Sequence, residues 1–170
     1  MIKLFKKHST KGGFTLIELL VVIAIIGVLA SIVLASLNNA RRKSRDARRV
    51  TDVKQIQLAL ELYFDAQGNQ YPVATATCDA TANAKGLEVL VTTGYIPQVP
   101  RDPSSSTTCY SYASPATGLR TTYHLGATLE ETTNPALNGD RDCTSAAAGC
   151  GAAAYTQGFA GTDPLYDVTP

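Results

Sequence analysis

The feature that most limits how this chain can fold is a run of uncharged residues near its N-terminus. Residues 19–37 read LLVVIAIIGVLASIVLASL, which is 19 residues without a single Asp, Glu, Lys or Arg. As an α-helix this run would be about 28 Å long, close to the roughly 30 Å hydrocarbon thickness of a bilayer. A helix that is apolar on every face is buried either in lipid or in a large protein core. The rest of the 170 residues is too small to enclose it, so we interpret the run as a membrane span.

Charge is distributed unevenly around this run, although the formal net charge of the whole chain is only +1. Residues 1–13 contain four Lys and no acid, and residues 41–49 contain six basic residues and one acid, a local charge of +5. Residues 50–170 contain five basic and twelve acidic residues, a local charge of −7. The chain therefore consists of a basic leader, an apolar helix, a basic collar (residues 41–49) and an acidic head. We expect the collar to contact anionic lipid headgroups or acidic patches of adjacent heads, in preference to DNA phosphates.

A cleaved secretory signal is the main alternative to a permanent span. Such a signal ends at small residues in an A-x-A pattern, whereas Asn38-Asn39-Ala40-Arg41-Arg42 follows this run. Basic residues flank the run on both sides, so the positive-inside rule does not settle its orientation. All four cysteines lie beyond residue 77. An even number of cysteines in a small head suggests disulfides in an oxidising compartment, which places the head outside the cytoplasm.

The junction between leader and span contains an unexpected acid, in the sequence Gly12-Gly13-Phe14-Thr15-Leu16-Ile17-Glu18. A carboxylate costs about 2.5–3.5 kcal/mol at the centre of a membrane helix and less near an interface, so Glu18 calls for a compensating cation. Cleavage after Gly13 would give Phe14 a free ammonium about one helical turn from Glu18. The ammonium of a neighbouring subunit would serve equally well.

This junction resembles the class III signal of type IV pilins and type II secretion pseudopilins. The resemblance lies in the Lys-rich leader, the sequence GFTLIE and the unbroken apolar helix, in that order. It implies that a membrane prepilin peptidase cuts after Gly13 on the cytoplasmic side and N-methylates Phe14. Glu18 would then be the fifth residue of the mature chain.

The resemblance continues into the head and is strongest to the major (G-type) pseudopilin. It covers roughly residues 10–130, including Tyr71-Pro72, GLEVLV at 86–91 and GYIP at 94–97. The last forty residues resemble no family. Many family members have Pro where this chain has Ala35, so the kink that Pro imposes on a helix is not expected here.

The sequence predicts an α+β, pilin-like fold, with a long N-terminal helix packed on a small antiparallel sheet. Residues 38–67 lack Gly and Pro, and their apolar residues recur on one helical face, so the helix should run from about 14 to 67. It would have a membrane half (14–37) and an amphipathic half (38–67), followed by a head (68–170). A short helix at 84–93, strands at 109–114 and 120–129, and one further strand near 153–159 are expected in the head.

Small residues recur along one face of the membrane half, at Gly27, Ser31 and Ala35. Residues of this kind four apart let membrane helices approach closely. We therefore expect Glu18 and these three residues to act in assembly.

No residue constellation in the chain points to catalysis. The mature chain would keep one histidine, His124, which we interpret as a strand residue, and no G-x-S-x-G, Walker A, C-x-x-C or H-E-x-x-H motif is present. The expected function is therefore not enzymatic.

Two weaker signals lie in the head. Four cysteines allow three pairings. We favour Cys78–Cys109 and Cys143–Cys150, which close one loop of about 30 residues and one of about 7, because the other pairings would tie the loop after the helix directly to the tail. The resemblance also implies calcium, since major pseudopilins bind it in a C-terminal loop and carboxylates are its usual ligands. The acids available for such a site are Asp140, Asp142, Asp163 and Asp167, and solvated loop acids are the alternative.

Together these patterns predict one membrane span with an extracytoplasmic head, and the resemblance implies that the chain is a structural subunit held in the bacterial inner membrane. The resemblance implies polymerisation with copies of itself into a pseudopilus or a surface pilus, and contacts with the prepilin peptidase, an assembly platform, minor pilins and lipid. The acidic head has no aromatic-basic stripe, so direct nucleic-acid binding is not expected. The alternative is a monomeric binding protein with an uncleaved anchor. In such a protein neither Gly13 nor Glu18 would have a role.

Overall fold

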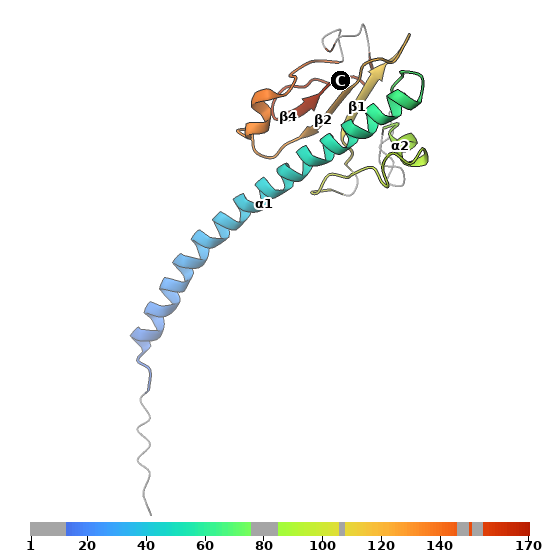
Figure 1. Ribbon diagram of the computed structural model, residues 1–170. Coiled ribbons are helices and arrows are strands. Elements are labelled where there is room, and N and C mark those ends of the chain that lie inside the picture. Colours follow the sequence, from blue (N-terminus) through green and yellow to red (C-terminus); the bar gives the residue numbers. More distant parts are fainter. Residues whose placement is uncertain (1–12, 76–84, 106–107, 146–149, 151–154) are drawn as a thin grey trace, which may run out of the picture. The chain divides into compact units, whose positions relative to one another are not determined.

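The computed structural model describes residues 13–75, 85–105, 108–145, 150 and 155–170. The chain divides into two compact units, residues 1–40 and residues 41–170. A single long helix, α1 (Leu16–Ala66), contributes to both units, and the second unit contains all the other helices and strands of the described residues (Figure 1). This is the predicted α+β, pilin-like architecture.

The first turn of α1 is stabilised by a reciprocal pair of contacts. The Thr15 Oγ1 accepts from the Glu18 amide at 3.3 Å, while Glu18 Oε2 accepts from the Thr15 amide at 2.8 Å and from the Thr15 hydroxyl at 2.7 Å. This arrangement is a capping box, which satisfies amide groups that have no partner inside the helix. The other end of α1 is closed by Gly68 and Asn69, both with positive φ, and the Asn69 amide donates to the Phe64 carbonyl at 3.0 Å.

The second half of α1 is amphipathic, as the spacing predicts. Val53, Ile56, Ala59 and Leu60 are at most 1% exposed and form one face of the main core. Apolar residues of the head complete this core, among them Tyr71, Leu87, Leu90, Tyr112, Tyr123, Leu125 and Tyr166. The apolar face of the helix is therefore covered by the head of its own chain.

The head contains a four-stranded antiparallel sheet in the order β3-β1-β2-β4. The two central strands are β1 (Ser111–Pro115) and β2 (His124–Thr128), with Tyr112 opposite Leu125. A two-residue strand, β3 (Tyr155–Thr156), lies on one side, within the region where one further strand was predicted. The short helix α2 (Glu88–Thr92) also lies in its predicted region.

The sequence did not predict the fourth strand, β4 (Leu165–Val168), which pairs with β2 and places Leu125 opposite Val168. A 3-10 helix, η1 (Pro135–Gly139), was also missed, and Asn134 caps it by accepting from the Ala136 amide at 3.0 Å. Both lie in a stretch rich in Ala, Gly and Thr, where a strand of four residues leaves no readable alternation of apolar side chains.

Candidate functional site

The predicted processing junction is exposed. Gly13 precedes α1, and an added Cβ there would meet no atom within 4 Å. The Phe14 side chain is 88% exposed. Glu18 lies one turn into α1, and its carboxylate is held by Thr15 of the same chain. This contact was not predicted, although T-x-x-E before an apolar run is the signature of a capping box.

The apolar half of α1 has no cover within its own unit. It contains an 18-residue stretch of mean hydropathy 3.0, none of it buried, which is long and apolar enough to cross a membrane. Gly27, Ser31 and Ala35 are exposed along it. An added Cβ at Gly27 would meet nothing within 4 Å, and the Ser31 hydroxyl donates to the Val28 carbonyl at 2.7 Å. The polar group of Ser31 is therefore satisfied within the helix.

Two of the six cations of the basic collar bind acids of their own head, which corrects, for these two, the expectation that the collar charges face lipid or adjacent heads. Arg49 is 2% exposed and donates to Asp102 through two nitrogens, and also to Asp46 and Glu130 at 2.7 and 2.9 Å. Arg45 donates to Glu130, with Nε 2.6 Å from Oε1. These two arginines bind acids of their own head. The collar cations that remain exposed are Arg41, Arg42, Lys43 and Arg48.

Asp46 completes this cluster from the helix side. It is fully buried, and its two carboxylate oxygens accept from the Glu130 and Glu131 amides, each at 2.9 Å. One acid of the collar therefore holds the chain just after β2 against α1. The sequence contains no local signal for this contact, because its partners lie more than 80 positions away.

The charges in this cluster shift the pKa values of two carboxyls in the same direction. Burial alone would raise the pKa of Asp102, but hydrogen bonds from Arg49 and Ser104 outweigh it and lower the pKa to about 2. The hydrogen bond from Arg45 is the main cause that lowers the pKa of Glu130 to about 2, assisted by Arg49. Both carboxylates are therefore ionised at every ordinary pH.

The structure brings together three of the four acids predicted for calcium. Ligand oxygens of Asp140, Asp142 and Asp167 lie within 4.8 Å of one another, whereas Asp163 is exposed and lies outside this group. Burial is the main cause that raises the pKa of Asp140 to about 6, and the charges of the other three acids add to it. Among the described residues, Asp140 Oδ1 is a buried oxygen without a hydrogen-bond partner. An adjoining cavity of about 290 Å³ is lined by Asp140, Asp167, Gln57 and Tyr166.

Asp167 also belongs to a second, fully buried cluster on the inner side of β4. Its Oδ2 lies 2.6 Å from His124 Nε2, and His124 Nδ1 lies 2.7 Å from the Ser145 hydroxyl. All three side chains are fully buried. The ring of Phe159 stacks on that of His124, with centroids 3.8 Å apart. Although the residue types are those of a hydrolytic triad, the hydroxyl has no access to a substrate, so the cluster has a structural role.

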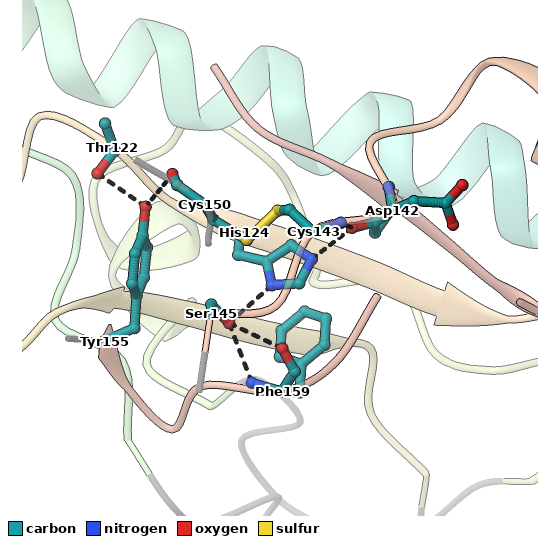
Figure 2. The surroundings of a disulfide bond; sticks show 9 residues. Thr122, His124, Asp142, Cys143, Ser145, Cys150, Tyr155 and Phe159 are labelled. Atoms are coloured by element: carbon teal, nitrogen blue, oxygen red, sulfur yellow. Dashed lines mark hydrogen bonds and ion pairs between the residues drawn. A yellow bond between two sulfur atoms is a disulfide. The ribbon is translucent and has the colours of Figure 1, made fainter. Parts of the chain in front are cut away.

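One predicted disulfide lies beside this cluster. Cys143 and Cys150 are bonded, with their Cα atoms 5.3 Å apart, as the sequence analysis predicted. Figure 2 shows the bond next to the His124 ring. Cys78 lies outside the described residues, so the pair Cys78–Cys109 stays a prediction.

Comparison with known proteins places these features in one family. Residues 8–34 match the prokaryotic N-terminal methylation motif. The chain is 34% identical over 139 residues to type II secretion system core protein G of Vibrio cholerae serotype O1, covering 74% of this chain and 87% of that protein. It is 30% identical over 139 residues to the Pseudomonas aeruginosa protein of the same name, covering 74% and 89% of the two chains.

The core protein G of Aeromonas hydrophila is 35% identical over 97 residues, which is 55% of this chain and 67% of that protein. No solved protein structure matches the chain. The similarity to these proteins covers up to 74% of the chain, far more than residues 8–34, so the likeness is not limited to the short methylation motif. The chain therefore belongs to the type II secretion system core protein G family, the major pseudopilins.

Proposed function

We propose that this chain is a structural subunit of a type II secretion pseudopilus, cut after Gly13, methylated at Phe14 and then polymerised. The observation that carries the proposal is the N-terminal methylation motif followed at once by an uncovered apolar helix, in a chain similar to core protein G over most of its length. Family membership also supports a structural and not an enzymatic role.

The proposed assembly step depends on Glu18. In the unassembled chain its carboxylate is partnered by the neutral groups of Thr15, which leave its negative charge uncompensated. Cleavage creates an ammonium at Phe14, and an entering subunit brings that ammonium to the Glu18 of a subunit already in the filament. Pairing opposite charges at low dielectric is strongly favourable relative to leaving either alone. The pairing would fix the axial register of each added subunit.

The apolar helix supplies the rest of the proposed contact. The stripe of Gly27, Ser31 and Ala35 has no bulky side chain, so two helices can approach closely along it. Such a stripe gives close packing but little register, since shifting it by four residues still superimposes small side chains. Glu18 supplies the register that the stripe lacks.

We also propose a calcium site in the head, at Asp140, Asp142 and Asp167. Two observations support the fit: a buried Asp140 oxygen lacks a partner among the described residues, and the neighbouring carboxylates help to raise the pKa of Asp140. A calcium ion, which takes six to eight oxygen ligands, would relieve both conditions. It would hold the loop after η1 against β4. Asp163 is not part of the proposed ligand set.

In this proposal the chain is anchored in the inner membrane by α1 as a single span, with its head outside the cytoplasm. Its partners are other copies of itself, the prepilin peptidase, the assembly platform and minor pilins. A surface type IV pilus is less favoured, because the similar proteins of Vibrio cholerae and Pseudomonas aeruginosa are named as secretion-system proteins. The methylation motif at residues 8–34 also argues against the alternative of a monomeric binding protein with an uncleaved anchor.

The Glu18→Leu variant tests the proposal in cells that lack the wild-type copy. It should insert, be cut after Gly13 and form the Cys143–Cys150 bond, because its head is unchanged. It should accumulate in the membrane and be absent from sheared filament fractions, while Glu18→Asp should be intermediate. Leu58→Ala, on the exposed face of α1 in the head unit, is the matched control and should give normal yield. Normal filament yield from Glu18→Leu would show that charge pairing does not order assembly.

A further inference from the structure

The buried cluster around the Cys143–Cys150 bond brings a histidine nitrogen and two cysteine sulfurs close together. A ring nitrogen of His124 and the Sγ atoms of Cys143 and Cys150 all lie within 4.8 Å of one another, and all three residues are buried. This group is separate from the three acids proposed for calcium, although Asp167 touches both. Two thiolates and an imidazole are ligands of borderline-soft metals such as Zn²⁺ and not of calcium.

We propose that the chain binds one Zn²⁺ at His124, Cys143 and Cys150 while these cysteines are still thiols, before the disulfide forms. Each thiol loses its proton to bind the metal, so two protons are released and no electron moves. Disulfide formation passes two electrons from the same sulfurs to an external disulfide, which is reduced to two thiols by thiol–disulfide exchange, and it eliminates the site. The metal and the disulfide are therefore mutually exclusive ways of holding the tail. This inference does not depend on the proposed filament.

The hydrogen bonds of His124 prepare the ring for this role. A carboxylate only accepts, so Nε2 donates its hydrogen to Asp167 Oδ2 at 2.6 Å. In the tautomer that this hydrogen bond favours, Nδ1 carries the lone pair that a metal ion needs. A histidine whose second nitrogen donates to a carboxylate is the usual arrangement of a metal-bound imidazole. Asp167 is itself fixed, since its oxygens accept from the Asp142 amide at 2.9 Å and the Cys143 amide at 3.3 Å.

The surroundings of Nδ1 also suit a ligand. Its neighbour in the oxidised chain is the Ser145 hydroxyl, at 2.7 Å. Ser145 has two other partners, the Phe159 amide at 3.0 Å and the Phe159 carbonyl at 3.2 Å. A metal on Nδ1 would therefore replace one of three Ser145 contacts and leave no buried group unpaired. Figure 2 shows Ser145, His124 and the two cysteines close together.

The ligands come from parts of the chain that the rest of the fold holds in place. His124 begins β2, and the Cys143 carbonyl accepts from the Gly161 amide at 2.8 Å. Cys150 is held through its carbonyl, which accepts from the Tyr155 hydroxyl at 2.8 Å. The positions of the donors therefore do not rest on the disulfide alone, and we expect them to persist when it is reduced.

The test uses the full chain in detergent, reduced with a phosphine that does not bind zinc. A short pulse of iodoacetamide, followed by peptide mass mapping, measures the reactivity of each thiol with Zn²⁺ and with EDTA. Zn²⁺ should slow alkylation of Cys143 and Cys150 at least tenfold in the wild type. His124→Asn should lose most of this protection, whereas Ser145→Ala should keep it because all three ligands remain.

X-ray absorption at the zinc edge covers the case in which His124→Asn does not fold, because it needs only the wild type. The loaded chain should show two sulfur ligands at about 2.3 Å and nitrogen at about 2.0–2.1 Å, and the oxidised chain should retain no zinc. Unprotected Cys143 and Cys150, equal protection in folded His124→Asn, or a zinc shell without sulfur and nitrogen would each overturn the proposal.

Discussion

Arg49 on α1 and Asp102 in the chain after α2 form a two-point ion pair, with Nε 2.7 Å from Oδ2 and Nη2 2.9 Å from Oδ1. The guanidinium also reaches Asp46 and Glu130, so one side chain joins the helix to two separate parts of the head. A buried cation with several acceptors is costly to remove, because the acids that remain lose their partner inside the protein.

Replacing Arg49 by Met should therefore destabilise the head strongly. We expect a loss of about 3–5 kcal/mol in the free energy of unfolding, since Asp46 is left buried and underpaired. Arg48→Met is the matched control. The Arg48 side chain is 64% exposed and its Nε lies 3.8 Å from Asp52 Oδ2, which is a weak surface ion pair. Its loss should lower the free energy of unfolding by less than about 1 kcal/mol. Urea unfolding followed by tyrosine fluorescence measures both. Equal losses for the two variants would contradict the role given to Arg49.

The pKa shifts predict opposite pH dependences from the two acid clusters. Asp102 and Glu130 have pKa values lowered to about 2 from ordinary values of 3.8 and 4.5, so their stabilisation is complete above pH 4.5 and is lost as the pH falls toward 2. Asp140 has its pKa raised from 3.8 to about 6, so its stabilisation is complete below pH 3.8 and is lost as the pH rises through 6.

The calcium-free chain should consequently be more stable at pH 5 than at pH 7. Thermal unfolding in EGTA across pH 3–8 should give a higher melting temperature at pH 5 than at pH 7. In Asp140→Asn the melting temperature should fall less between these two pH values. The acid side of the profile should be unchanged in that variant. A fall above pH 5 that persists in Asp140→Asn would show that another group causes it.

Calcium itself should raise the melting temperature of the head at pH 7, and less so below pH 6, where protons compete for Asp140. Asp140→Asn should abolish most of the calcium-induced rise. Asp163→Asn is the matched control, because this exposed acid lies outside the group of three, and it should keep the rise. Loss of the effect in both variants would indicate general charge screening and not a site.

Gly161 should tolerate no side chain. A Cβ there would lie 2.1 Å from Asp167 Oδ2 and 2.7 Å from the Cys143 carbonyl, so Gly161→Ala must displace a carboxylate with fixed partners. We expect a loss of about 1–3 kcal/mol, as for other overpacked sites. At Gly139 a Cβ would meet nothing within 4 Å, so Gly139→Ala should be nearly neutral. Similar melting temperatures for Gly161→Ala and the wild type would contradict the packing described.

The parts of the fold that the sequence predicts are those with a local signal. Three signals of this kind can be read from short stretches of sequence. They are the absence of charge in residues 19–37, the helical spacing of Val53, Ile56 and Leu60, and the helix-ending pair Gly68-Asn69. The disulfide Cys143–Cys150 is also predictable, since its loop is short.

The contacts that escape prediction join positions far apart in the chain. The sequence places Asp46 within a basic collar, yet its partners besides Arg49 are amides more than 80 residues away. The pattern around His124 indicates only an ordinary strand residue, because its partner Asp167 lies on β4, a strand too short to show a pattern. The neighbouring acids Asp163 and Asp167 cannot be told apart from sequence, because their different burial depends on tertiary packing.

The mass of the N-terminal peptide, after extraction of the protein from the membrane, decides whether the chain is a processed pseudopilin. The peptide should begin at Phe14 and carry one added methyl group, with residues 1–13 absent. A terminus at Met1 would mean that the chain stays as an uncleaved anchor, and one beyond Leu37 would mean that the apolar helix is a discarded signal. Either result would contradict the account.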